Sequence, residues 1–253
     1  MPDALLSVST LSKRFGGLLA LSDLSFDVQA GEIYGVIGPN GAGKTTLFSC
    51  LVGAARPTSG EIRFLGERID GLPNWAVVSR GVVRTHQIVR PFRQMTVAEN
   101  VSVGAHFGAG RRRGADAEWR VESILERTGL ASKAKALAGT LTIGESKRLE
   151  IARAVATEPT VLCLDEVMGG LNPSEIQHSM ALIRSLRDSG LTVLLIEHHV
   201  HAVVSVSDRI LVLNFGEKIA EGAPGDVLRD PAVISAYLGG DDGDGGGQTG
   251  ATA

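Results

Sequence analysis

The chain has few cysteines, no long apolar run and no surplus of basic residues, and each shortage excludes a class of protein. Its 253 residues include only Cys50 and Cys163, which form neither a disulfide framework nor a metal motif, so we expect both to be small core residues. The longest apolar runs, such as 161–164 and 193–196, are far shorter than the roughly 18 residues that span a bilayer, and we expect no transmembrane segment. With 28 acidic and 25 basic residues, the chain lacks the positive surplus of a nucleic-acid-binding protein.

The N-terminal sequence MPDALLSVST carries neither a positive leader nor a long apolar segment. We therefore expect no secretion signal and a cytosolic protein. Hydrophobic residues make up 43% of the chain, which suffices for a sizeable core in one large domain or two closely joined subdomains.

Short β-branched runs at 33–37, 161–164 and 192–196 are each followed by a turn and an amphipathic stretch. This order predicts an α/β fold with a largely parallel sheet. Residues 6–28 and 61–65 instead alternate between apolar and polar, which predicts a small antiparallel sheet beside the parallel one.

Between residues 96 and 156 the pattern changes to successive helices without a convincing strand, which indicates an inserted helical subdomain. We therefore predict four segments along the chain. They are the antiparallel subdomain with the first part of the core (1–90), the helical subdomain (91–156), the second part of the core (157–238), and a disordered Gly/Asp tail (239–253).

One helix in the second part of the core has a clear beginning and end. Asn172 can cap it, Pro173 suits its first position, Glu175 completes a capping box, and Gly190 follows its last turn.

The most specific motif is GPNGAGKTT, which satisfies G-x-x-x-x-G-K-[ST] between a predicted strand and a predicted helix. Its glycines let backbone N–H groups and the positive end of a helix face a phosphate, while Lys44 adds a full charge. We expect these residues to bind a nucleotide: Gly38, Pro39, Asn40, Gly41, Ala42, Gly43, Lys44, Thr45 and Thr46.

Two acids at the end of a predicted strand complete a phosphate-transfer site. Thr45 offers a hydroxyl to Mg²⁺, and Asp165 is the carboxylate expected opposite it. Glu166 follows directly and can polarise a water for attack on the terminal phosphate. The alternative for Glu166 is a solvated acid at a strand end.

From Leu6 to Leu238 the sequence resembles ABC-transporter nucleotide-binding subunits, with six motifs in family order. The resemblance implies a P-loop NTPase (RecA-like) core that uses ATP and Mg²⁺. It implies that Phe15 stacks on adenine, that Gln87 acts in catalysis and metal binding, and that His198 acts in catalysis. It also implies that Asp165 holds the metal through water, and that LTIGE replaces the LSGGQ signature, which acts across a dimer of two such subunits. The signature residues are Leu141, Thr142, Ile143, Gly144 and Glu145.

The signature also has its own physical interpretation, because Thr142 and Glu145 form a T-x-x-E capping box. We expect an exposed Gly144 at this helix N-terminus to favour the terminal phosphate of ATP in the other subunit. Glu145 departs from the usual Gln and places negative charge near that phosphate, so we hypothesise that it weakens ATP-driven closure.

Three further departures from the family pattern leave every catalytic group in place. Val167 stands where Pro is common, Asn172 where Asp is common, and His86 precedes the glutamine. Val167 leaves the loop after Glu166 less constrained than Pro would, which bears on the catalytic rate.

Within this family, the sequence most resembles the ATPase subunits of importers for branched-chain amino acids and for related urea and amide solutes. Segments that carry the resemblance include FGGLLAL, GVVRTHQIVRPFRQMTVAEN and SDRILVLNFGEKIAEG. It implies a peripheral protein on the cytoplasmic face of the membrane. Its partners would be a second ATPase subunit, identical or similar, two multi-span permease subunits and, indirectly, a solute-binding protein.

Other interpretations stay open for several features. The chain could be a soluble ABC-type ATPase without a transporter, or a non-hydrolysing ATP-gated module, although Glu166 and His198 argue against the latter. His198, His199 and His201 could bind a metal, but no fourth-ligand pattern accompanies them. The run Arg111–Arg113 could contact nucleic acid or lipid, or form a solvated loop.

The segment after Gln87 contains Arg90, Pro91, Phe92, Arg93 and Met95. Apolar residues framed by arginine suit the docking of a permease helix. Phe92 and Met95 could equally pack the hinge between the subdomains.

Overall fold

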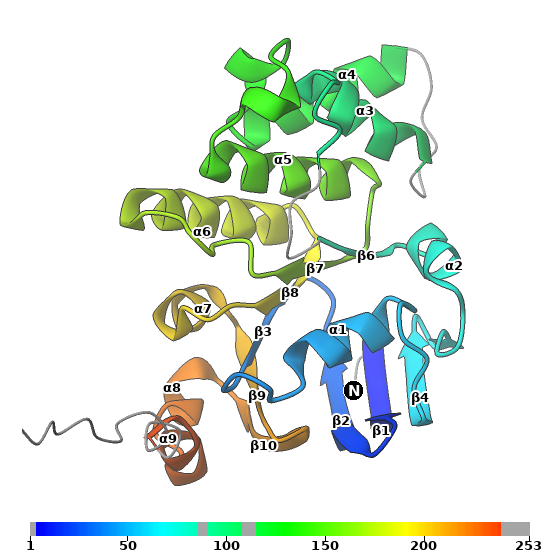
Figure 1. The fold of residues 1–253 in the computed structure, drawn as a ribbon, viewed down its shortest axis with the longest axis vertical. Coiled ribbons are helices and arrows are strands. Elements are labelled where there is room, and N and C mark those ends of the chain that lie inside the picture. Colours follow the sequence, from blue (N-terminus) through cyan, green and yellow to red (C-terminus); the bar gives the residue numbers. More distant parts are fainter. Residues whose placement is uncertain (1–3, 86–90, 108–114, 239–253) are drawn as a thin grey trace, which may run out of the picture.

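A computed structural model describes residues 4–85, 91–107 and 115–238 of the chain (Figure 1). His86, Gln87, Arg90, the run Arg111–Arg113 and the tail 239–253 lie outside these described residues. The expectations that concern them therefore stay predictions.

The expected antiparallel sheet is present near the N-terminus, with the strand order β2-β1-β4-β5. Its strands are β1 (Leu6–Phe15), β2 (Leu18–Val28), β4 (Ser59–Phe64) and β5 (Glu67–Arg68). Leu6 pairs with Val28 on one side and with Phe64 on the other, and all three side chains are buried. The sheet therefore turns an apolar face toward the core.

The second sheet has six strands in the order β10-β9-β3-β8-β7-β6. They are β3 (Ile33–Ile37), β6 (Val82–Arg84), β7 (Val161–Asp165), β8 (Thr192–Ile196), β9 (Arg209–Asn214) and β10 (Glu217–Gly222). All neighbours are parallel except β9 and β10. The sequence patterns predicted β3, β7 and β8, which are buried along their whole length, but did not mark β6, β9 or β10.

The helices of the described segments are α1 (Lys44–Leu51), α2 (Asn74–Ser79), α3 (Val97–Phe107), α4 (Ala115–Arg127), α5 (Ile143–Ala156), α6 (Pro173–Asp188), α7 (Val200–Val206), α8 (Pro224–Val227) and α9 (Pro231–Leu238). Most of these helices lie around this sheet, while α3, α4 and α5 form a separate region at one end of the molecule (Figure 1). Short 3₁₀ turns at 131–133 and 138–140 connect α4 to α5. The interval from 96 to 156 is thus helical where it is described.

Two apolar clusters lie on opposite faces of the six-stranded sheet. Leu162 and Leu164 of β7 face the cluster that contains the helices α3 to α7, while Cys163 faces the cluster of α1 and the antiparallel sheet. In that second cluster, Phe26 stacks on Tyr34 with ring centroids 5.5 Å apart. The core therefore links both sheets.

Both cysteines lie in this second cluster, as expected. Burial raises the pKa of the Cys50 thiol to about 11 and that of Cys163 to about 12. Both are therefore uncharged core side chains at neutral pH.

The predicted start of α6 is confirmed in detail. The Glu175 N–H donates to Asn172 Oδ1 at 3.0 Å, and the Asn172 N–H donates to Glu175 Oε2 at 3.0 Å. Pro173 is the first helical residue, and Gly190 follows the helix with a φ of 95°.

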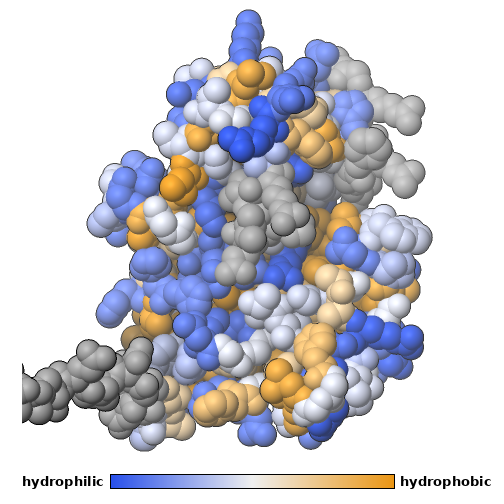
Figure 2. Space-filling view, in the orientation of Figure 1, coloured by the Kyte–Doolittle hydropathy of each residue, from blue (hydrophilic) through white to orange (hydrophobic). Residues whose placement is uncertain are grey.

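The surface in Figure 2 is mostly hydrophilic, with apolar residues in scattered patches. Among the described helices, none is both long enough and apolar enough to cross a bilayer. The division of the chain at residues 90, 156 and 238 stays a prediction. Its first and third segments share one sheet, because β6 pairs with β7.

Candidate active site

The loop 38–43 connects β3 to α1, and its glycines are required by geometry. Gly43 has a φ of 101°, and a Cβ placed there would lie 2.6 Å from the carbonyl oxygen of Ala20. A Cβ at Gly38 would lie 2.1 Å from the carbonyl oxygen of Leu213. Any side chain at these two positions would displace the loop from β2 or β9.

Lys44 begins α1 and is almost fully buried. Its Nζ atom donates to the carbonyl oxygens of Gly38 at 2.6 Å and of Pro39 at 2.9 Å. Burial lowers the pKa of Lys44, while the nearby charges of Glu166 and Asp165 act in the opposite direction. The lysine thus holds the loop in shape through its two hydrogen bonds.

A cavity of about 520 Å³ opens beside this loop, within the range of roughly 300 to 1,000 Å³ of small-molecule sites. The residues that line it come from the loop, from two hairpins and from the ends of two strands: Phe15, Leu18, Leu19, Ala20, Asn40, Gly41, Ala42, Gly43, Lys44, Thr45, Thr46, Glu166, His198 and Phe215. Phe15 is 50% exposed at the end of β1, so its ring is accessible to a ligand. The structure therefore brings Phe15, Glu166 and His198 to the cavity beside the loop, while their roles stay predictions.

Asp165 ends β7 and is completely buried. Its Oδ2 atom forms an ion pair with Arg84 of β6, while its Oδ1 atom has no hydrogen-bond partner among the described residues. Arg84 also donates to Ser49 Oγ at 2.9 Å. The sequence analysis missed Arg84, because a single arginine after a two-residue apolar run forms no motif.

Glu166 follows Asp165 with a φ of 52°, in the left-handed region that non-glycine residues rarely adopt. Its backbone carbonyl accepts a hydrogen bond of 2.8 Å from Lys147 of α5. The Oε1 atom lies 2.7 Å from His198 Nε2, which fixes the direction of the carboxylate. Thr10 and Leu65 share this left-handed conformation, so Glu166 is distinguished by its contact with His198 at the cavity and not by its φ.

Glu197, directly before His198, is a second group that sequence reasoning missed. Its side chain is buried and accepts a hydrogen bond of 2.6 Å from the backbone N–H of Met168. Burial raises the pKa of Glu197 to about 7, although this hydrogen bond and the charge of Lys147 oppose the change. Glu197 thus connects the end of β8 to the loop that follows Glu166.

The expected capping box of α5 is present. Glu145 N–H donates to Thr142 Oγ1 at 3.2 Å, and the Thr142 N–H donates to Glu145 Oε2 at 2.9 Å. Glu145 also pairs with Lys133 at 3.4 Å. The N–H of Thr142 and the charge of Lys133 hold the pKa of Glu145 below its usual value.

Gly144 corrects one expectation, because it is buried rather than exposed. The Glu175 carboxylate lies against it, so that a Cβ at Gly144 would be 2.5 Å from Glu175 Oε1. None of the residues 141–145 lines the cavity beside the loop, although all five are described.

Two departures from the family pattern have structural explanations. Val167 is buried in the core cluster of the helices α3 to α7. Its packing fixes the loop after Glu166, whereas a proline would do so by restricting φ. Asn172 caps α6, a role in which Asn and Asp are equivalent.

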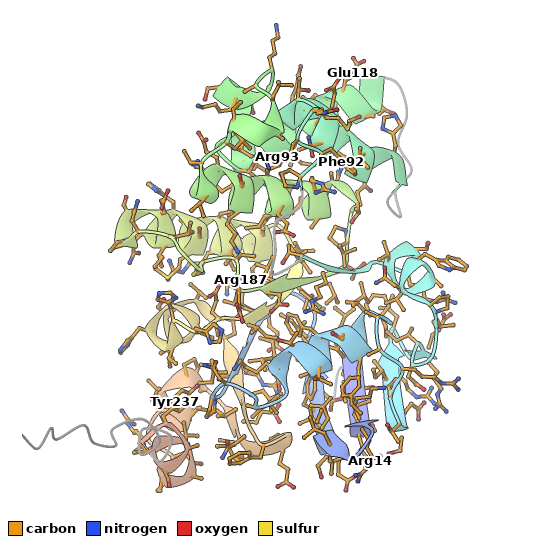
Figure 3. All side chains as sticks on the ribbon, viewed as in Figure 1. Arg14, Phe92, Arg93, Glu118, Arg187 and Tyr237 are labelled. Atoms are coloured by element: carbon orange, nitrogen blue, oxygen red, sulfur yellow. The ribbon has the colours of Figure 1, made fainter. Side chains whose placement is uncertain are left out.

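Phe92 and Arg93 lie beside α5 in the helical region (Figure 3). Phe92 is 45% exposed, and the Arg153 guanidinium lies 4.9 Å from the centroid of its ring. Asn100 holds the Phe92 backbone with hydrogen bonds of 2.9 and 3.1 Å. Phe92 thus packs on the helical region and still presents one part of its ring to solvent. His199 and His201, by contrast, are exposed at the start of α7.

Comparison with protein families gives two matches. The family described as "ABC transporter" matches residues 21–169, and the family described as "Branched-chain amino acid ATP-binding cassette transporter" matches residues 217–243.

Several curated proteins are similar over nearly the whole chain. The high-affinity branched-chain amino acid transport ATP-binding protein BraF of Pseudomonas aeruginosa is 46% identical, covering 94% of this chain and 99% of its own. The corresponding protein LivG of Escherichia coli is 44% identical with the same coverage. BraG of Pseudomonas aeruginosa is 35% identical and covers 93% of this chain and 100% of its own.

Solved structures of ATP-binding cassettes are also similar to this chain. A crystal structure of the ADP conformation of an ATP-binding cassette of an ABC transporter has a TM-score of 0.84 at 31% identity, covering 94% of this chain and 99% of that one. A nucleotide-free ATP-binding cassette has a TM-score of 0.82 at 29% identity, covering 93% and 99%.

Proposed function

Because the chain belongs to the ABC transporter family of ATP-binding cassettes, we propose that it drives an importer of branched-chain amino acids or of a related small polar solute. One observation carries the proposal: residues 40–46, Glu166 and His198 converge on one cavity in a chain that is 46% identical to a branched-chain amino acid transport ATP-binding protein.

Bound ATP would place its phosphates on the loop and its adenine on Phe15. The N–H groups of the loop and the start of α1 supply partial positive charge. Lys44 would exchange its bonds to the carbonyls of Gly38 and Pro39 for bonds to phosphate oxygens. Because Lys44 is already in place, few atoms need to be reordered when the anion binds.

The residues at the end of β7 fit a Mg²⁺ ion. Asp165 Oδ1 is a buried acceptor without a hydrogen-bond partner among the described residues. A metal ion or a metal-bound water would satisfy this oxygen. Thr45 is exposed to the same cavity. When bound, Mg²⁺ neutralises charge on the terminal phosphates. We expect Thr45 and Gln87 to contact the ion directly and Asp165 to hold it through water.

For hydrolysis, Glu166 accepts a proton from the water that attacks the terminal phosphorus, as the bond to the leaving ADP oxygen breaks. His198 orients the carboxylate through its 2.7 Å contact and can also face the phosphate, because its side chain is half exposed to the cavity. The strained backbone of Glu166 points the side chain into the site.

A second ATPase subunit would complete the site. Residues 141–145 lie at the start of a helix outside the cavity of their own chain, so the segment that covers bound ATP would come from a partner. Pseudomonas aeruginosa has two ATP-binding proteins similar to this chain, at 46% and 35% identity. Two different proteins of this kind in one organism favour a pair of unequal subunits over a homodimer.

We place the protein at the cytoplasmic face of the membrane, bound to two permease subunits that receive solute from a binding protein. Pro91 and Arg93 line a groove, and the exposed part of Phe92, which stands between them in the sequence, suits contact with a permease helix. The alternative of a soluble ABC ATPase is less well supported, because the curated relatives named above are transport proteins.

The proposal is tested by ATP binding and by transport together. The purified chain should bind Mg²⁺-ATP, and Lys44→Ala should weaken binding strongly. Co-expression with permease and binding-protein partners from the same genome should give ATP-dependent uptake of leucine or isoleucine. ATP binding without association to any of these membrane subunits would leave the soluble alternative.

A further inference from the structure

A second aromatic ring lies at the nucleotide cavity and has no role in the site described so far. Phe215 occupies the turn between β9 and β10 and is 85% exposed. It lines the cavity together with Phe15, the other aromatic residue among its described lining residues. Exposure alone is not informative, since Trp75 and Trp119 are 72% and 70% exposed, but Phe215 lies where a bound ligand could cover its ring.

The turn that carries Phe215 is fixed against the loop. The Gly216 N–H donates to the carbonyl oxygen of Ala42 at 3.1 Å, and the Ser22 N–H donates to the carbonyl oxygen of Gly216 at 2.9 Å. The turn therefore lies between the loop and β2. The loop and β2 both contribute residues to the cavity wall. The position of the Phe215 ring is therefore set partly by the loop that would hold the phosphates.

The backbone at Phe215 is strained, since its φ is 46° in a region that bulky residues avoid. Gly216 follows with a φ of 84°, and such two-residue turns favour Asn or Asp at the first position. Strain alone does not indicate function, because Leu65 has the same geometry. It has a φ of 51°, is followed by Gly66 at 77°, and is 64% exposed between β4 and β5. Leu65 lines no cavity beside the loop, so Phe215 differs from it in location.

We propose that Phe215 packs against the nucleoside part of bound ATP, as a second apolar contact beside Phe15. The two rings come from the tips of two hairpins, β1–β2 and β9–β10, and both rings line the cavity beside the glycine-rich loop. A base or ribose held between them would cover apolar surface that is otherwise in water. The inference rests on the proposed function, because it requires the cavity to hold ATP.

Phe215 also borders a second cavity, of about 760 Å³, formed by the loop, the β9–β10 turn and α9. Tyr237 of α9, which Figure 3 labels near the lower end of the molecule, lines that cavity. The ring thus separates two openings, and only the first also contains Lys44, Thr45 and Glu166. We assign the contact to that opening because a nucleoside must lie beside its own phosphates.

The experiment compares two ligands that share the phosphate chain. ATP and inorganic tripolyphosphate, each with Mg²⁺, are titrated by calorimetry into the wild-type chain, Phe215→Ala, Phe215→Trp and the control Leu65→Ala. Phe215→Ala should weaken ATP binding about tenfold and leave tripolyphosphate binding unchanged, since only ATP has a nucleoside. Phe215→Trp should bind ATP as the wild type does, and Leu65→Ala should change neither affinity.

The outcomes separate this inference from the proposed function. If Phe215→Ala binds ATP as tightly as the wild type, or loses both ligands equally, the nucleoside contact is refuted. If the wild type binds neither ligand, the ATP-binding function itself fails. Phe215→Asn adds a variant suited to the left-handed turn, and it should weaken ATP binding and spare tripolyphosphate binding even if alanine perturbs folding.

Discussion

Arg84 of β6 and Asp165 of β7 form a buried ion pair across two neighbouring strands, although 81 positions separate them in the sequence. The aspartate is fully buried, and the arginine side chain is 13% exposed. Arg84 holds one carboxylate oxygen and leaves the other without a partner. The pair thus fixes the orientation in which Asp165 faces the phosphate site.

Replacing Arg84 with methionine should destabilise the fold, because it leaves a buried carboxylate without its counter-charge. We expect a loss of about 3 to 5 kcal/mol in the free energy of unfolding, measured with urea. The double variant Arg84→Met with Asp165→Asn should recover a large part of it. The free energy of unfolding of Arg84→Lys should lie between those of the wild type and Arg84→Met, because lysine keeps the charge but lacks the planar guanidinium group. Equal stability of Arg84→Met and wild type would contradict the role of this pair.

Glu166→Gln should leave Mg²⁺-ATP binding intact and slow hydrolysis by about a hundredfold or more, since glutamine cannot accept the proton of the attacking water. Binding is measured by calorimetry and turnover by phosphate release. Glu217→Gln, an exposed position on β10, is the control and should change neither. Near-normal turnover of Glu166→Gln would remove Glu166 from the role of general base.

Glu197 should make stability depend on pH. Burial raises its pKa from 4.5 to about 7 in the folded state, so between these values the folded protein binds more protons than the unfolded chain. Its contribution is therefore most favourable below about pH 4.5 and declines as pH rises to about 7, by up to about 3 kcal/mol. Urea unfolding of the wild type and of Glu197→Gln across this range should show a steeper loss of stability in the wild type, because Glu32, whose pKa burial also raises, contributes equally to both. Parallel curves would mean that Glu197 ionises as it does in the unfolded chain.

Glu145→Gln should tighten the ATP-dependent dimer, since glutamine retains the capping box but removes a negative charge beside the partner's phosphate. The existing pair with Lys133 offsets part of that charge, so we expect an effect of only about two- to fivefold in the dimer dissociation constant. Analytical ultracentrifugation in a Glu166→Gln background avoids turnover. Glu126→Gln, exposed on α4, serves as the control. An unchanged or weaker dimer would reject the hypothesis about Glu145.

Phe92→Ala should reduce solute uptake by the assembled transporter while the isolated chain keeps its ATPase activity, if the ring contacts a permease helix. Trp119→Ala on α4 removes another exposed aromatic ring, which is 70% exposed, and should leave uptake unchanged. A Phe92→Ala chain that fails to fold would instead support packing at the hinge, as its contact with Arg153 allows.

Features that depend on neighbours in the sequence could be predicted from the sequence. The loop 38–46 and both capping boxes are short motifs whose residues act on each other within a few positions, and the boxes are present as expected. The strands β3, β7 and β8 were also predictable, because burial on both faces makes them continuously apolar.

Features that depend on tertiary placement could not be predicted. Arg84 and Glu197 act on residues brought close by the strand order, which no local pattern encodes. β6 has only three residues, and the edge strand β10 is polar and only half buried, so neither resembles a buried strand. The error about Gly144 has the same cause, since Glu175 reaches it from another helix.

The contact between Gly144 and Glu175 places a carboxylate of the chain itself at the N-terminus of α5, where it competes with any other anion for that helix end. One carboxylate, from Glu145, closes the first turn of the helix, and a second, from Glu175, presses against its glycine. A phosphate arriving from the partner subunit would meet a surface already screened by two acids rather than an open positive pole. Because the Asn172 N–H also holds Glu175 Oε2 at 3.0 Å, this screening is tied to the cap of α6, and it would lower the affinity of the helix start for the partner's phosphate.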